Sequence, residues 1–158
     1  IEFMPLSEHP ADCSWGYQNT GFFSPTSRYG TAHQLMQLVD TCHQAGIGVI
    51  LDFVPVHFAV DGYALNHYDG TTLYEYPEKE DNYSEWGSCN FIHARGEVCS
   101  FLQSCANYWL SVFHFDGLRM DAVSRHQSRQ HHVPETHESG IAPAAPGQHA
   151  DRRRLHQL

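Results

Sequence analysis

The feature that most constrains the fold is the apolar run "GVILDFVP" at residues 48–55, which ends at Pro55. Aliphatic and aromatic residues follow one another in this run with almost no polar alternation. Such a run is typical of a strand that is covered on both faces, as in a parallel sheet. Asp52 is the exception, because a carboxylate in a buried strand needs a partner or a chemical task.

Strands and helices alternate along the first three quarters of the chain, which predicts an α/β fold with a parallel sheet. Helical spacing of apolar residues marks two helices, and two further apolar runs read as strands. The second helix has the clearest apolar stripe. The strands are "IEFMPL" (1–6), the run at 48–55 and "FDGLRMDAV" (115–123), and the helices are 31–46 and 97–114, with a stripe of Val98, Phe101, Leu102, Cys105, Trp109, Val112 and Phe113.

The composition sets limits on partners and location. The 158 residues are 41% hydrophobic, enough for one core, and the formal charge of −9 argues against nucleic acid or an anionic membrane as a partner. Five cysteines without a CxxC pair predict neither disulfides nor a zinc knuckle. No apolar run is long enough to span a bilayer. We expect a cytoplasmic protein without a cofactor, and the start at "IEFMPL" without a methionine suggests a fragment.

Two loops have features that a simple connection between secondary-structure elements does not need. The first, "SWGYQNTGFF" (14–23), holds aromatic side chains that could stack on sugar rings, beside Gln18 and Asn19, which could bind hydroxyl groups. The alternative is that its aromatics fold over an edge of the core. The second loop spans roughly residues 58–96, and a loop of this length in a compact domain is usually functional or disordered.

The third strand carries a charged pair. Alternation places Arg119 and Asp121 on one face, with Leu118, Met120 and Ala122 on the other. A neighbouring guanidinium favours the charged carboxylate, so Asp121 could serve as a nucleophile or a charge stabiliser. A purely structural Arg–Asp pair is the alternative.

Asp52 and His57 lie at the end of the second strand. In α/β sheets, ligands bind at the carboxyl ends of the strands. The alternative is an aspartate that caps a loop and a histidine that packs. Two neighbouring strands that both end in polar groups favour a site over that alternative.

The pattern stops after residue 123. Residues 124–158 contain no aromatic side chain and hold more than half of the Lys and Arg residues, which predicts a segment that does not fold by itself. Three of its histidines, His131, His132 and His137, lack the regular spacing of metal ligands, so no metal site is expected there. We therefore divide the chain into a domain at 1–123 and an unpatterned tail at 124–158.

Several of these motifs resemble those of glycoside hydrolase family 13, the α-amylase family, and within it the glycogen branching enzymes. "DFVPVH" is similar to the first conserved region and "GLRMDAV" to the second. The branching-enzyme resemblance rests on "MPLSEHP", "SWGYQNTGFFSPTSRYG", "HQAGIGVILDFVP", "FDGTTLYEY" and "EWGSCNF". The resemblance covers residues 1 to about 124 and implies a partial (β/α)₈ barrel, roughly its strands two to four.

The resemblance also implies roles for five residues. Asp121 would be the catalytic nucleophile and Arg119 would hold it ionised, while Tyr17, Asp52 and His57 would bind the transferred glucose. The reaction implied is a retaining transfer on an α-glucan that makes α-1,6 branches. The second carboxyl group, a glutamate on the fifth barrel strand, has no matching motif in 124–158, where a reading-frame shift near Ser124 would explain the loss of pattern.

Three alternatives stay open. Another member of the family would share Asp121 and Arg119 but transfer the sugar to water. An incomplete barrel would catalyse nothing, because its general acid is missing and its sheet edges are unpaired. A small glucan-binding module would use the aromatic loop alone. The oligomeric state is not indicated by any pattern.

Overall fold

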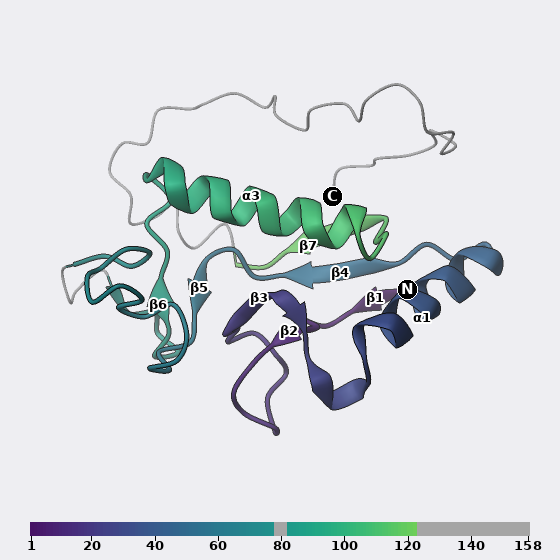
Figure 1. Ribbon diagram of the computed structural model, residues 1–158, viewed down its shortest axis with the longest axis horizontal. Coiled ribbons are helices and arrows are strands. Elements are labelled where there is room, and N and C mark those ends of the chain that lie inside the picture. The colour runs from purple at the N-terminus through teal and green to yellow at the C-terminus, as the bar shows by residue number, and fades with distance from the viewer. Residues whose placement is uncertain (78–81, 123–158) are drawn as a thin grey trace.

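A parallel sheet of three strands forms the centre of the molecule (Figure 1). In the computed structural model, which describes residues 1–77 and 82–122, its strands are β1 (Glu2–Phe3), β4 (Ile50–Phe53) and β7 (Gly117–Met120). Their order is β1-β4-β7, and both pairings are parallel. The parallel α/β sheet predicted from the apolar run at 48–55 is therefore confirmed.

Two helices connect the parallel strands. α1 (Ala32–Gln44) leads from β1 towards β4, and α3 (Gly96–Ser111) precedes β7. Thr31 caps α1 in a capping box with Gln34, and Gly46 follows the helix with a φ of +72°, a conformation that glycine adopts without strain. Both helices lie where the spacing of apolar residues predicts them.

Two short antiparallel pairs and a 3₁₀ turn occupy the connections. β2 (Ser7–Glu8) pairs with β3 (Gly21–Pro25), and β5 (His57–Phe58) pairs with β6 (Cys89–Asn90). The 3₁₀ turn η1 (Ser27–Tyr29) leads into α1. The sequence predicted no strand at these positions, because β2, β5 and β6 have two residues each, too few to show alternation, and β3 begins inside the aromatic loop.

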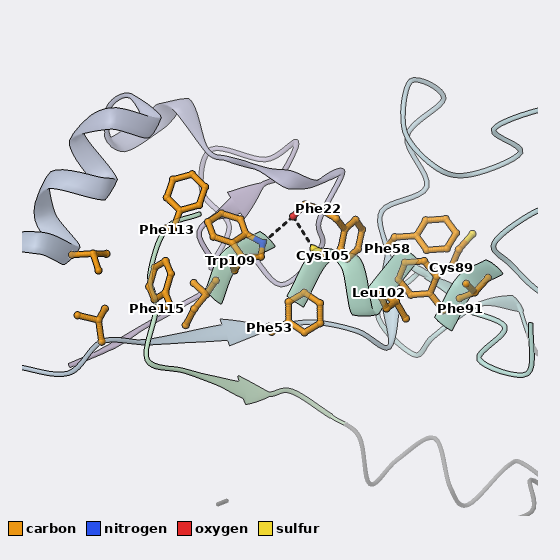
Figure 2. Close-up of a cluster of buried hydrophobic side chains, with 14 of the residues drawn as sticks. Phe22, Phe53, Phe58, Cys89, Phe91, Leu102, Cys105, Trp109, Phe113 and Phe115 are labelled. Carbon is orange, nitrogen blue, oxygen red and sulfur yellow. Dashed lines mark hydrogen bonds between the residues drawn. The ribbon is translucent and has the colours of Figure 1, made fainter. Parts of the chain in front are cut away.

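The core lies between α3 and the sheet (Figure 2). Leu51 and Phe53 of β4 point to this side, where they meet side chains of α3 that include Leu102 and Trp109. Trp109 is fully buried, and its indole Nε1 donates to the carbonyl oxygen of Phe22 at 2.9 Å. This hydrogen bond satisfies the polar atom of a buried indole and attaches α3 to β3.

The far ends of α3 and β7 differ from the sequence prediction. Val112 was assigned to the apolar stripe, but it follows the end of α3 and is 40% exposed. Met120, which alternation places on the face opposite to Arg119, is 46% exposed. β7 is the outermost strand among the described residues, so no strand there adjoins its second edge. Ala122 has a φ of +53°, which ends the extended run expected to reach residue 123.

The long connection at 58–96 is ordered in its described parts. Glu75 is fully buried, and its Oε1 accepts a hydrogen bond from the backbone N–H of His67 at 2.8 Å. Arg95 Nη1 donates to the carbonyl oxygens of Thr72 and Leu73. A single bridge also pairs Glu75 with Phe91. Side chains thus bind the backbone of this segment in place of a continuous sheet.

Residues 124–158, predicted to form an unpatterned tail, lie outside the described residues. Neither described helix combines the length and the hydropathy that crossing a lipid bilayer demands.

Candidate active site

The candidate active site begins with two residues that pair across the central sheet. In the register of β4 and β7, Asp52 lies opposite Arg119, so both side chains project from the face of the sheet that is turned away from α3. Arg119 Nη1 donates to Asp52 Oδ2 at 3.0 Å and to Asp121 Oδ1 at 2.9 Å. The prediction that Arg119 and Asp121 share a face is confirmed, and Asp52 joins them.

The guanidinium is held by the two carboxylates. Burial would by itself lower the pKa of Arg119, but the negative charges of Asp52 and Asp121 outweigh that effect and raise it. Asp52 is 4% exposed, whereas the Arg119 side chain is 46% exposed. The site therefore has a buried carboxylate at its base and an accessible cation at its rim.

Tyr17 comes from the aromatic loop and completes the base of the site. Its hydroxyl donates to Asp52 Oδ2 at 2.5 Å. Burial, the hydrogen bond and the charge of Asp52 together raise the pKa of Tyr17 to about 12, so the phenol keeps its proton at neutral pH. Tyr17 and Arg119 thus both donate to the same oxygen of Asp52.

His57 in β5 contacts the same loop. Its Nε2 lies 2.9 Å from the carbonyl oxygen of Tyr17, and because a carbonyl only accepts, Nε2 carries the proton. Burial lowers the pKa of His57 more than this hydrogen bond raises it, so the ring is neutral at pH 7. In that tautomer, Nδ1 is a hydrogen-bond acceptor.

Two buried polar atoms of the site have no hydrogen-bond partner among the described residues: Asp52 Oδ1 and His57 Nδ1. A buried acceptor without a donor costs about 1–3 kcal/mol. Both atoms could accept hydrogen bonds from the hydroxyl groups of a polyhydroxylated ligand. The arrangement therefore offers two acceptors, a cation and the Asp121 carboxylate, whose side chain is 21% exposed.

Two neighbours of Tyr17 differ in role. Asn19 was considered as a ligand for hydroxyl groups, but it is 1% exposed and its amide donates to the carbonyl oxygen of Gly16 at 2.7 Å. It stabilises the loop instead. Gln18 Nε2 donates to the carbonyl oxygen of Trp86 at 3.1 Å. Sequence reasoning did not place Trp86 at the site, and no local pattern links residues so far apart.

The other aromatic side chains of the first loop differ in burial and in location. Phe22 is buried in the core, and its ring is in edge contact with Phe91. Trp15 is 77% exposed and lines a separate hollow of about 490 Å³, beside Phe3, Tyr29 and Leu38. None of the five predicted site residues lines that hollow, so it is not the candidate active site.

Among the described residues, neither a disulfide nor a cluster of candidate metal ligands is formed. All five cysteines are free. Within residues 1–77 and 82–122, no group of three or more His, Cys, Asp or Glu side chains could hold a metal ion. His131, His132 and His137, for which no metal site was expected, lie outside the described residues.

Comparison with known families identifies the fold around this site. Residues 3–95 match the catalytic domain of alpha-amylase. The chain belongs to the alpha-amylase family. Phe3 of β1 and all of β4 fall within the match, while Arg119 in β7 and Asp121, directly after that strand, follow it.

Curated relatives of this alpha-amylase-family chain are branching enzymes. It is 58% identical over 125 residues to the 1,4-alpha-glucan branching enzyme GlgB of Nitrosomonas eutropha, and 56% identical over 125 residues to that of Dechloromonas aromatica. Each match covers 78% of this chain, but 17% and 20% of the respective relative. The chain thus spans about a fifth of the length of the curated relatives it matches.

Solved structures show the same fold. A putative alpha amylase from Salmonella typhimurium is 29% identical with a TM-score of 0.66, covering 79% of this chain and 20% of that one. The alpha-amylase from Geobacillus thermoleovorans, solved with acarbose, is 23% identical with a TM-score of 0.68, covering 78% and 30%. The predicted membership of the alpha-amylase family is therefore confirmed. Which strands of a complete barrel the chain supplies stays a prediction.

Proposed function

We propose that this chain supplies the nucleophile side of the active site of a 1,4-α-glucan branching enzyme. Asp121 is the nucleophile, Arg119 keeps it ionised, and Tyr17, Asp52 and His57 bind the glucose unit that is transferred. One observation carries the proposal: hydrogen bonds connect these five residues, with His57 joined through the backbone carbonyl of Tyr17, in a chain that is 58% identical to a branching enzyme.

The first chemical step forms a bond to the protein. The Asp121 carboxylate attacks the anomeric carbon of an α-1,4-linked glucose, and the bond from that carbon to the 4-oxygen of the next glucose breaks. A general acid protonates the departing oxygen. In the second step, the 6-hydroxyl of another glucan chain attacks the same carbon, releases Asp121 and returns its proton to the conjugate base of that acid. Two displacements retain the α configuration.

The remaining side chains hold the sugar and balance charge. Arg119 lies within hydrogen-bond distance of the nucleophile, so its positive charge stabilises the Asp121 carboxylate before attack. Asp52 Oδ1 and His57 Nδ1 accept hydrogen bonds from hydroxyl groups of the glucose ring. Tyr17 fixes the Asp52 carboxylate so that its second oxygen stays directed to the ligand.

The general acid is not assigned to any residue here. Asp52 is a poor candidate, because Oδ2 already accepts hydrogen bonds from a phenol and a guanidinium, as an ionised carboxylate does. Glu135 and Glu138 lie in the stretch that follows residue 123, outside the described residues. We infer that the 158-residue chain, offering roughly barrel strands two to four, does not transfer glucan by itself, since a closed barrel takes roughly 250 residues.

A hydrolase is the second candidate function. The Salmonella typhimurium and Geobacillus thermoleovorans proteins share the fold and are named as amylases, yet they are 29% and 23% identical to this chain. Identity of 56% or more to branching enzymes favours transfer to a glucan over transfer to water. We also infer a cytoplasmic location, where the five free cysteines would stay reduced.

The product of the complete gene, incubated with amylose, tests the proposal. Branching shortens the unbranched segments, so iodine staining falls without release of reducing sugar. A steady release of reducing sugar would instead assign a hydrolase. The 158-residue chain assayed in parallel should leave iodine staining unchanged, and affinity electrophoresis in glycogen shows whether that chain binds glucan without catalysing transfer.

A further inference from the structure

Trp86 occupies a tight turn whose shape is fixed by its own hydrogen bonds. The backbone N–H of Ser84 donates to the carbonyl oxygen of Ser88 at 2.8 Å, and Ser84 Oγ accepts from the backbone N–H groups of Trp86 and Ser88. Gly87 has a φ of +76°, which a side chain would strain. The indole is therefore presented from a defined backbone.

This turn lies against the candidate active site. Gln18, next to Tyr17 in the chain, donates from Nε2 to the carbonyl oxygen of Trp86 at 3.1 Å. The rings of Trp86 and His57 lie 5.4 Å apart between centroids, at an interplanar angle of 58°. Two segments distant in sequence, the aromatic loop and the turn, thus meet beside His57.

The exposure of Trp86 separates it from the structural aromatics. Trp109 is fully buried and its indole nitrogen donates a hydrogen bond to the carbonyl oxygen of Phe22, whereas Trp86 is 48% exposed. The backbone of Trp86 is fixed by the turn, while about half of the residue stays accessible to a ligand. Beside it, His57 Nδ1 is a buried acceptor without a partner among the described residues.

An aromatic surface beside a few buried polar groups is the usual composition of a small-ligand site. A glucose ring carries its hydroxyl groups around its rim and C–H groups on its faces. It can therefore contact an indole with one face while its hydroxyl groups reach acceptors at the edge. Trp86 and His57 offer these two kinds of contact side by side.

We propose that Trp86 is a glucan-binding residue, whose indole packs against the face of a glucose unit held beside His57. The inference rests on the proposed glucan function and assigns it a residue outside the five predicted from the sequence. Trp86 takes no part in bond breaking. Its contribution is to the affinity for a glucan chain.

Calorimetric titration of the full 158-residue chain with maltoheptaose tests this assignment. Trp86→Ala should raise the dissociation constant about tenfold, and Trp86→Phe should keep it within about threefold of the wild type because a ring remains. Tyr29→Ala, which removes another exposed aromatic (72% exposed), should leave it unchanged. Circular dichroism and urea midpoints verify that each variant folds.

A second measurement keeps the tryptophan in place. In a Trp15→Phe background, Trp86 is the exposed indole and Trp109 is buried. Maltoheptaose should then reduce the quenching of tryptophan fluorescence by acrylamide, because the bound sugar covers Trp86. This result does not depend on whether Trp86→Ala folds.

The outcomes separate the two proposals. If the wild type binds maltoheptaose but neither Trp86→Ala nor the quenching experiment shows an effect, the role of Trp86 is refuted and the glucan function stands. If the wild type fails to bind maltoheptaose, the glucan site proposed for this chain fails, and the role of Trp86 fails with it.

Discussion

Arg119 and Asp52 are register partners on neighbouring parallel strands, and the guanidinium Nη1 donates to the Asp52 carboxylate at 3.0 Å. Because the same nitrogen also donates to Asp121 at 2.9 Å, one cation separates two carboxylates that would otherwise repel each other. The same charged side chains that would act on a substrate also neutralise one another across β4 and β7. Changing one of them should therefore affect both the proposed reaction and the stability of the sheet.

Removing the cation should destabilise the chain. We expect Arg119→Met to lower the free energy of unfolding by about 1–2 kcal/mol, because a buried carboxylate loses a charged donor while the partial exposure of Arg119 weakens the interaction. Urea unfolding followed by circular dichroism measures the change. Adding Asp52→Asn to Arg119→Met should restore part of the loss, since the repulsion between carboxylates is then removed. Equal midpoints for wild type and Arg119→Met would refute the coupling.

Removing the nucleophile should abolish transfer with little effect on folding. In the product of the complete gene, Asp121→Asn is expected to lower the rate of iodine-stain loss about 10³-fold or more, because an amide cannot form the covalent intermediate. Asp12→Asn is the matched control: this carboxylate pairs with Arg28 and is 87% exposed. If Asp121→Asn keeps more than a tenth of the wild-type rate, Asp121 is not the nucleophile.

The attachment of α3 to β3 through Trp109 should dominate stability (Figure 2). Trp109→Ala is expected to cost about 3–5 kcal/mol, since it empties a fully buried indole site. Trp109→Phe should cost about 1–3 kcal/mol, because it removes the hydrogen bond to Phe22 but keeps a ring. Chemical denaturation measures both values. Trp15→Phe, at a 77% exposed position, should change stability by less than about 0.5 kcal/mol.

Glu8 should make stability depend on pH in the acid range. Burial raises the pKa of Glu8, but hydrogen bonds from the backbone N–H groups of Ser27 and His9 and from Arg28 outweigh it and lower the pKa below 4.5. A lowered folded-state pKa gives stability that is fully present above the unfolded value and is lost as the pH falls through the folded value. Glu8→Gln should therefore be less stable than the wild type at pH 7.

The same comparison at low pH provides the check. Urea midpoints of wild type and Glu8→Gln should converge as the pH falls from 4.5 through the lower folded-state pKa of Glu8, because the folded wild-type carboxyl then becomes protonated and resembles the amide. A gap between the midpoints that stays constant from pH 7 to pH 3 would show that the difference is not due to the charge of Glu8.

Local patterns were sufficient for the regular elements and for one part of the site. Helical spacing located α1 and α3, and alternation along β7 placed Arg119 and Asp121 on one face, because both periods are properties of neighbouring residues. The short strands at 57–58 and 89–90 carry no such period. Their pairing depends on backbone groups brought together by the rest of the fold.

The sequence by itself determined the parallel α/β class through local periodicity, and the resemblance of its motifs to the α-amylase family implied the five candidate site residues. The tertiary structure decided that Arg119 bridges Asp52 and Asp121, that Asn19 is structural, and that Trp86 lies beside His57. Strand register and the meeting of distant loops arise from packing across the whole chain. A contact between residues 67 positions apart, as between Asp52 and Arg119, has no signature in either local segment.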